Sequence, residues 1–365
     1  MKKKILKKIG IVVLIILGIF LLFVIGLFIF HRVKSNQELE LLKEKEYYNL
    51  VSVGDYNLNV SMFGNDSGKH KIIGLAGLGS GDFSVAMRKM TASLEEDNLV
   101  VFVDRAGYGF SDDTNKNMTL ERIVEDYRTA LKKAGIKAPY ILMPHSIGGA
   151  YATYWVSKYP EEIESVVFID GSELSENAFS DEPKERVGVG DHILTTLAKL
   201  GFSRLVLRKY FYHYPDNYSD EEQLLADALE LRTLDSIAPI SESSLLADNA
   251  QKAFKAIITN DVPKLYICSS WGFEDKQTLL DYYSWMNRQI EINHLKSQLT
   301  SNSLSDEKID EILKSYSDAR NKTIYPYADK MGNCEVVCLG GDHMIYEQKP
   351  KECGKIIQSY IDGLE

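Results

Sequence analysis

The feature that most constrains the fold is an alternation of short apolar runs and helical patterns between residues 71 and 170. The apolar runs read KIIGL, NLVVFVD, YILM and ESVVFID. Their apolar residues are consecutive, which is typical of strands buried on both faces of a parallel sheet. Helical patterns at 118–135 and 147–159 separate the last three runs with short connections. We therefore expect an α/β fold with a mostly parallel central sheet flanked by helices.

After residue 170 the strand patterns give way to a long helical stretch. Residues 171–262 contain helix signals, among them Ser219 and Glu222 in the spacing of a capping box. A helical segment inserted between strands of a parallel sheet commonly covers one edge of that sheet. We therefore predict a helical cap insertion over 171–262.

Strand patterns return in two further runs, at 263–269 and 333–341. The sequence between them is again helical, which predicts a second helical insertion over 270–332. A hairpin pattern opens the folded region and a helix pattern closes it. The predicted domain therefore extends over 47–365.

The amino-terminal part of the chain contains an unbroken apolar run, residues 9–30. Twenty-two residues at about 1.5 Å each cover roughly the 30 Å of bilayer hydrocarbon. The run is apolar on every face, unlike an amphipathic helix of a soluble protein, and no small-residue cleavage site follows it. We predict a transmembrane anchor at 9–30, with a basic tail at 1–8 before it and a charged stalk at 31–46 after it.

The distribution of charge predicts the orientation of this anchor. Residues 1–8 contain five lysines, whereas only Arg32 and Lys34 closely follow the span. The positive-inside rule therefore predicts a single-pass protein of the cell membrane with a cytoplasmic N-terminus and an extracellular domain. The chain beyond residue 34 has a formal charge of −17, which argues against a nucleic-acid partner.

The sequence PHSIGG, residues 144–149, marks a sharp change from a strand pattern to a helix pattern. Ser146 is expected on this corner, at the carboxyl end of a strand, where open parallel sheets bind ligands. The start of the following helix favours negative charge. These properties suit a nucleophile for acyl transfer. A serine that only caps the helix is the alternative, and this motif alone leaves both open.

A serine nucleophile needs a base. Only His343 follows a predicted core strand, in the sequence GGDHMIYEQKP, which brings it to the same sheet edge as Ser146. His145 directly precedes the serine and is expected to point away from it. The other histidines adjoin the apolar run, lie in a turn or fall in helical insertions: His31, His70, His192, His213 and His294. His343 is therefore the predicted base.

The acid that would orient His343 has two candidates. Asp170 ends the run ESVVFID, and Asp275 follows the run KLYICSSWGFED. Either carboxylate could orient the imidazole and stabilise its charged form. Asp275 could instead cap the next helix, and Asp170 could simply hold a loop. The residues themselves leave the choice open.

A tetrahedral intermediate needs two backbone donors. We expect one from the N–H of Ile147, directly after the serine, and one from Leu78 in the loop LAGLGSG. That loop lacks the lysine and the spacing of a phosphate-binding loop. No metal or organic cofactor is implied.

These features together resemble the α/β-hydrolase superfamily over residues 47–365. The motifs are GLAGLGSG, DRAGYGFSD, PHSIGG, FIDG and GGDHMIYEQKP. The chain looks most like membrane-anchored hydrolases of Gram-positive bacteria, related to the proline-iminopeptidase and esterase branches. The resemblance implies the α/β-hydrolase fold and a serine hydrolase that cleaves an ester or amide through an acyl-enzyme. The dehalogenase and epoxide-hydrolase branches resemble this fold but use an aspartate nucleophile, so Ser146 argues against them.

The chain departs from the family pattern in two places. Pro144 replaces the first glycine of the G-x-S-x-G elbow, and Ala76 replaces the histidine of the usual His-Gly pair. Neither change removes a catalytic group. Many family members place the acid after the strand that corresponds to 265–268, and a minority use the position of Asp170. The irregular sequence before Asp275 favours Asp170 here.

Two alternatives to a hydrolase remain open from the sequence. The departures from the motif would also suit a catalytically silent surface protein that binds a partner. The same catalytic residues would support acyl transfer to an acceptor other than water. The substrate, whether a small molecule, a peptide or a lipid, is not specified by the sequence.

Overall fold

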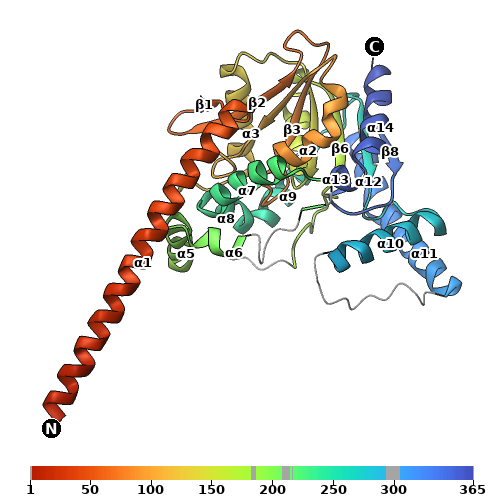
Figure 1. The fold of residues 1–365 in the computed structure, drawn as a ribbon. Coiled ribbons are helices and arrows are strands. Elements are labelled where there is room, and N and C mark those ends of the chain that lie inside the picture. Colours follow the sequence, from red (N-terminus) through yellow and green to blue (C-terminus); the bar gives the residue numbers. More distant parts are fainter. Residues whose placement is uncertain (1, 182–185, 208–213, 216, 293–304, 365) are drawn as a thin grey trace.

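The computed structural model describes residues 2–364 apart from 182–185, 208–213, 216 and 293–304. In the described residues eight strands form a sheet in the order β1-β2-β4-β3-β5-β6-β7-β8. Their bounds are β1 (Leu50–Ser52), β2 (Asn57–Gly64), β3 (Lys71–Leu75), β4 (Leu99–Val103), β5 (Tyr140–Ser146), β6 (Ile163–Gly171), β7 (Lys264–Cys268) and β8 (Cys334–Cys338). Strand β2 pairs antiparallel with β1 and β4, and every other pair is parallel. The predicted mostly parallel sheet is confirmed (Figure 1).

Helices cover both faces of the sheet, which explains why the strand sequences do not alternate. Neighbouring strand residues such as Ile141 and Leu142 belong to two different hydrophobic cores, one on each face. One core includes α3 (Leu120–Lys133) and α4 (Gly148–Lys158). The other includes α2 (Phe83–Thr91), α13 (Ile345–Gln348) and α14 (Pro350–Asp362). A side chain on either face of a central strand is therefore removed from water.

The described residues between β6 and β7 form helices. These are α5 (Val189–Lys199), α6 (Phe202–Val206), α7 (Asp220–Leu234), α8 (Ala238–Ser244) and α9 (Leu246–Lys255). The predicted capping box of α7 is confirmed, because Ser219 Oγ accepts from Glu222 N at 3.2 Å and Ser219 N donates to Glu222 Oε2 at 2.7 Å. Gly201, at φ +98°, separates α5 from α6 in a stretch whose sequence reads as one helical pattern.

The segment between β7 and β8 is also helical where it is described. It contains α10 (Lys276–Ile292), α11 (Asp306–Lys322) and α12 (Ile324–Met331). Part of the predicted second insertion, 293–304, lies outside the described residues. The limits of the predicted domains themselves stay predictions.

A single helix, α1 (Lys2–Glu44), contains the apolar run and continues through most of the predicted stalk. It is long and apolar enough to cross a membrane by length and composition. Its amino-terminal half projects from the molecule in Figure 1, and its carboxyl-terminal half packs beside α5, α6 and α7. Leu27, His31 and Leu42 of α1 are buried.

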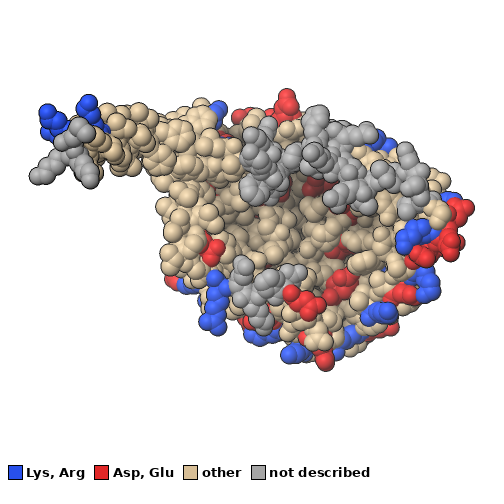
Figure 2. Space-filling model, turned by 90° about the horizontal axis from the view of Figure 1, so that it is seen from below, with Lys and Arg blue, Asp and Glu red and all other residues tan. Residues whose placement is uncertain are grey.

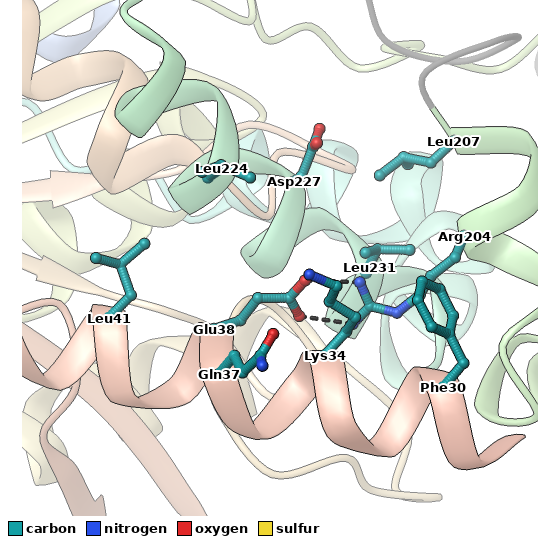
Figure 3. A pocket seen from close by; sticks show the side chains of 10 residues that line it. All are labelled: Phe30, Lys34, Gln37, Glu38, Leu41, Arg204, Leu207, Leu224, Asp227 and Leu231. Atoms are coloured by element: carbon teal, nitrogen blue, oxygen red, sulfur yellow. Dashed lines mark hydrogen bonds and ion pairs between the residues drawn. The ribbon is translucent and has the colours of Figure 1, made fainter.

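An ion pair and a pocket mark the contact between α1 and the helices after β6. Arg204 of α6 donates from both Nη1 and Nη2 to the Glu38 carboxylate at 2.6 Å. The pocket between them measures about 390 Å³. Figure 3 shows the lining side chains: Phe30, Lys34, Gln37, Glu38, Leu41, Arg204, Leu207, Leu224, Asp227 and Leu231. Helix α1 and the folded domain are therefore joined by side-chain packing as well as by the chain.

Candidate active site

Ser146 is the last residue of β5, and α4 begins two residues later at Gly148. Its φ of +52° lies in the left-handed region, which is costly for a residue with a side chain. The tight turn also needs Gly148, since a Cβ there would lie 2.4 Å from the carbonyl oxygen of Leu75. Pro144 pairs in register with Leu75 inside β5, so the strand accommodates the proline that replaces the first glycine of the motif.

Asp170 and His343 meet at the carboxyl ends of the strands. Asp170 lies near the end of β6, and His343 lies in the loop after β8. The distance from His343 Nδ1 to Asp170 Oδ2 is 2.7 Å. The side chain of Asp170 is 8% exposed and that of His343 is 47% exposed. The buried carboxylate therefore holds an imidazole whose other side remains accessible.

Three further hydrogen bonds fix the Asp170 carboxylate. Oδ1 accepts from the backbone N–H groups of Ser269 at 2.7 Å and Ser270 at 3.1 Å. Oδ2 accepts from the Ser270 hydroxyl at 2.5 Å. All these donors lie at the end of β7, so the neighbouring strand sets the direction of the carboxylate. Hydrogen bonds to the charged form of a carboxyl group favour ionisation.

Each member of this pair stabilises the charge of the other. Burial acts to raise the pKa of Asp170, but the hydrogen bond and charge of His343, with the Ser270 and Ser269 donors, hold it below its usual 3.8. Burial acts to lower the pKa of His343, but the hydrogen bond and charge of Asp170 hold it above its usual 6.5. The arrangement therefore stabilises an imidazolium beside a carboxylate.

Asp275, the other candidate acid, caps a helix. Its carboxylate accepts from Thr278 N at 2.9 Å and from Thr278 Oγ1 at 2.8 Å, at the start of α10. These hydrogen bonds hold the pKa of Asp275 below its usual value. The side chain is exposed. Its described partners are those of an N-cap residue and do not include His343.

The loop that contains Leu78 lies directly against the serine corner. A Cβ on Gly77 would lie 3.1 Å from Ser146 Cβ and 2.9 Å from His145 Nδ1. No hydrogen bond from the N–H of Leu78 or of Ile147 is found in the described part of the chain. Both backbone N–H groups predicted from the sequence thus lie near the serine and donate a hydrogen bond to no described group.

Arg105 holds this loop in place, a role that the sequence did not reveal. Its Nη1 donates to the Ala76 carbonyl and its Nη2 to the Gly77 carbonyl, both at 2.7 Å. Its Nε donates to Glu242 Oε2 at 2.9 Å, and both side chains are almost fully buried. Arg105 belongs to the motif DRAGYGFSD, and this motif was the feature of the sequence that could have identified it. Glu242 belongs to α8 in the predicted cap insertion, and no local pattern singled it out.

A second carboxylate from the same insertion supports the far end of the loop. Glu230 of α7 accepts from Gly81 N at 2.7 Å and from Asp82 N at 3.0 Å. Helix α7 of the predicted cap therefore contributes to the geometry of the loop beside Ser146.

The side chain of His145 contacts the backbone of His343. Its Nε2 lies 3.0 Å from the His343 carbonyl oxygen. Since a carbonyl only accepts hydrogen bonds, His145 carries its proton on Nε2. Burial, and then the charge of His343, lower the pKa of His145 to about 3. His145 is therefore neutral near pH 7 and positions the loop that carries His343.

The remaining histidines lie elsewhere or fall outside the description. His31 lies 3.6 Å from Asp235 at the contact of α1 with the following helices, and His70 lies 2.7 Å from Glu164. His192 is exposed on α5. His213 and His294 are outside the described residues. Among described residues, no group of three or more His, Cys, Asp or Glu side chains is arranged to hold a metal ion.

Comparisons with known proteins agree with this architecture. A family model described as the alpha/beta hydrolase fold matches residues 74–193. YbdG of Bacillus subtilis (strain 168) is 27% identical over 344 residues, 91% of this chain and 90% of that protein. A chloroplastic Arabidopsis thaliana protein assigned to the methylesterases is 37% identical over 101 residues, 26% of this chain and 29% of that protein.

Solved structures show the same fold at low sequence identity. Haloalkane dehalogenase DatA from Agrobacterium tumefaciens C58 matches with a TM-score of 0.54 and 16% identity, over 87% of this chain and 96% of that chain. Haloalkane dehalogenase DbeA from Bradyrhizobium elkani USDA94 matches with a TM-score of 0.51 and 13% identity, over 87% of this chain and 97% of that chain. The matches favour a hydrolase. Together with the eight-stranded sheet, they show that the chain has the α/β-hydrolase fold.

Proposed function

We propose that the protein is a serine hydrolase that cleaves an ester or amide bond. Ser146 is the nucleophile, His343 is the general base and acid, and Asp170 orients His343. The observation that carries the proposal is the 2.7 Å contact of His343 Nδ1 with the buried Asp170 carboxylate, at the sheet edge where Ser146 ends β5 with φ +52°. This arrangement suits Ser-His-Asp acyl transfer.

The reaction proceeds in two halves. His343 Nε2 accepts the Ser146 hydroxyl proton as Oγ attacks the substrate carbonyl, and Asp170 stabilises the imidazolium that forms. The N–H groups of Leu78 and Ile147 stabilise the oxyanion. His343 then protonates the leaving alcohol or amine, which leaves an ester on Ser146. Water attacks this ester as His343 accepts its proton, and His343 then returns that proton to Ser146 Oγ as the acid product leaves.

A fluorescent fluorophosphonate tests the nucleophile without knowledge of the substrate. The full chain in membranes should become labelled, and Ser146→Ala should abolish labelling. Ser175→Ala, which removes an exposed serine outside the site, is the matched control and should label like the parent. Labelling of Ser146→Ala would assign the nucleophile to another residue. Absence of labelling of a folded parent would exclude this function and favour a binding protein of the same fold.

We infer that α1 tethers this hydrolase to the cell membrane, with the N-terminus in the cytoplasm and the catalytic domain outside. The apolar helix and the five lysines before it support this topology. Protease added to intact protoplasts should digest the domain, while a cytoplasmic marker protein survives. Protection of the domain until detergent is added would contradict the orientation.

A further inference from the structure

Helices α5 and α6 present an apolar face to solvent beside the anchor helix. The exposed side chains are Val189, Ile193, Leu194, Leu197 and Leu205, with Val189 78% and Leu194 64% exposed. Val189, Ile193 and Leu197 follow one another at a spacing of four residues, which places them on one side of α5. The buried Thr195 and Ala198 face the protein. A helix of a soluble domain normally turns its apolar side inward, so this face needs a partner.

Helix α1 fixes the depth of this face relative to the apolar run. The ring centroids of Phe23 in α1 and Phe202 in α6 are 6.3 Å apart. A Cβ on Gly201 would lie 2.8 Å from His31 Cβ, so the start of α6 packs closely on α1. Phe23 precedes Phe30, the end of the apolar run, by about 10 Å along a helix axis. The Phe202 side chain therefore reaches below the level at which the apolar run ends, while Gly201 lies beside Leu27 and His31, close to that level.

We propose that the α5–α6 face lies in the outer leaflet of the membrane that α1 spans. Helices at a membrane surface bury their apolar side about 5–10 Å into the boundary between headgroups and acyl chains, which matches the depth set by Phe23. The exposed Arg32 and Lys34 follow the run where lipid phosphates lie. The proposal rests on the membrane tether inferred above.

The surface around α5 and α6 has the character that such contact requires. Figure 2 shows the side of the molecule toward which the amino-terminal half of α1 projects. The part next to α1 is largely free of charged side chains, which gather farther from it. The predicted cap thus lies against lipid, and an amphiphilic acyl substrate would meet it first.

Quenching of tryptophan fluorescence by brominated lipid tests this contact in the full chain. Three variants, Leu194→Trp, Phe20→Trp and Ser359→Trp, are placed in nanodiscs made of two brominated phosphatidylcholines, one with bromine near the headgroup end of an acyl chain and one with bromine near its methyl end, because Phe20 lies near the middle of the apolar run. Phe20 lies in the apolar run, and Ser359 is exposed on α14 (Figure 1). The parent chain, with Trp155, Trp271 and Trp285, provides the emission to subtract.

The three variants separate the proposal from the tether on which it rests. We expect the added emission of Leu194→Trp and Phe20→Trp to be mostly lost in brominated lipid, and that of Ser359→Trp to be retained. Quenching of Phe20→Trp but not of Leu194→Trp would overturn the membrane contact of α5 and α6 and leave the tether intact. Absence of quenching in Phe20→Trp would overturn both.

Discussion

Asp170 and Asp275 have chemically identical side chains, but their surroundings give the two carboxylates different roles. Asp170 is buried against His343 and receives donors from Ser269 and Ser270. Asp275 is exposed and bonds to Thr278 at a helix start. A buried carboxylate fixed on several sides orients its partner strongly, whereas an exposed cap contributes mainly to local helix stability.

Replacing the two acids in turn tests this difference. Asp170→Asn should lower kcat/KM for a chromogenic ester by roughly 10⁴-fold, because an amide does not stabilise the imidazolium or its required tautomer. Asp275→Asn should change kcat/KM by less than about threefold, since asparagine is also a good N-cap. The reverse order of effects would assign the acid to Asp275.

The pH dependence of the reaction follows from His343. Its pKa lies above 6.5, and it must be neutral to accept the Ser146 proton. Activity should therefore fall as the pH drops through a midpoint above 6.5, measured as kcat/KM against pH. In Asp170→Asn the largest interactions that raise the pKa of His343 are lost, while burial, which lowers it, and the smaller raising effects of Asp342 and Glu173 remain. The midpoint should then move to lower pH, and an unchanged midpoint would count against the pairing.

The junction of β5 and α4 is the element on which the candidate site depends. The strand ends on Ser146 with a positive φ, and the helix starts against the β3 backbone at Leu75. Arg105 and Glu230 hold the neighbouring loop from opposite ends. The geometry of the serine is thus set by one tight turn and by contacts from elements distant in the chain.

Two glycine substitutions separate close packing from helix propensity. Gly148→Ala should destabilise the protein by about 1–3 kcal/mol, because the new Cβ would overlap the Leu75 carbonyl oxygen. Gly190→Ala on α5 has no atom within 4 Å of the new Cβ and should stabilise by up to about 1 kcal/mol. Both are measured by thermal unfolding in detergent. Equal effects would show that the turn at Gly148 can relax.

At the scale of the whole molecule, helix α1 belongs partly to the folded domain. Leu42 is fully buried and shares a hydrophobic core with β3, β4 and α14, although it lies in the predicted stalk. Arg204 joins α6 to Glu38 in the same part of α1. The orientation of the domain relative to α1 is therefore fixed by packing.

Leucine truncation measures this coupling. Leu42→Ala should lower the free energy of unfolding by about 2–5 kcal/mol, as expected for a buried leucine. Leu50→Ala, at a side chain that is 37% exposed, should cost less than about 1 kcal/mol. Denaturant unfolding of the full chain in detergent provides the comparison. A small effect of Leu42→Ala would mean that α1 is only a flexible tether.

The sequence by itself determined the mostly parallel sheet, the capping box at Ser219 and the long apolar helix. These features depend on side-chain periodicity and on contacts within a few residues, which a sequence displays directly. It also directed attention to Ser146 and His343, because short motifs at strand ends meet at one edge of a parallel sheet.

Only the tertiary structure placed Asp170, and not Asp275, beside His343, since the two aspartates follow similar strand patterns. The same is true of Arg105 with Glu242, of Leu42 in the core and of Phe23 against Phe202. Each of these pairs joins residues far apart in the chain. Their contacts exist only once the sheet, the helices after β6 and helix α1 have packed together, so no local pattern specifies them.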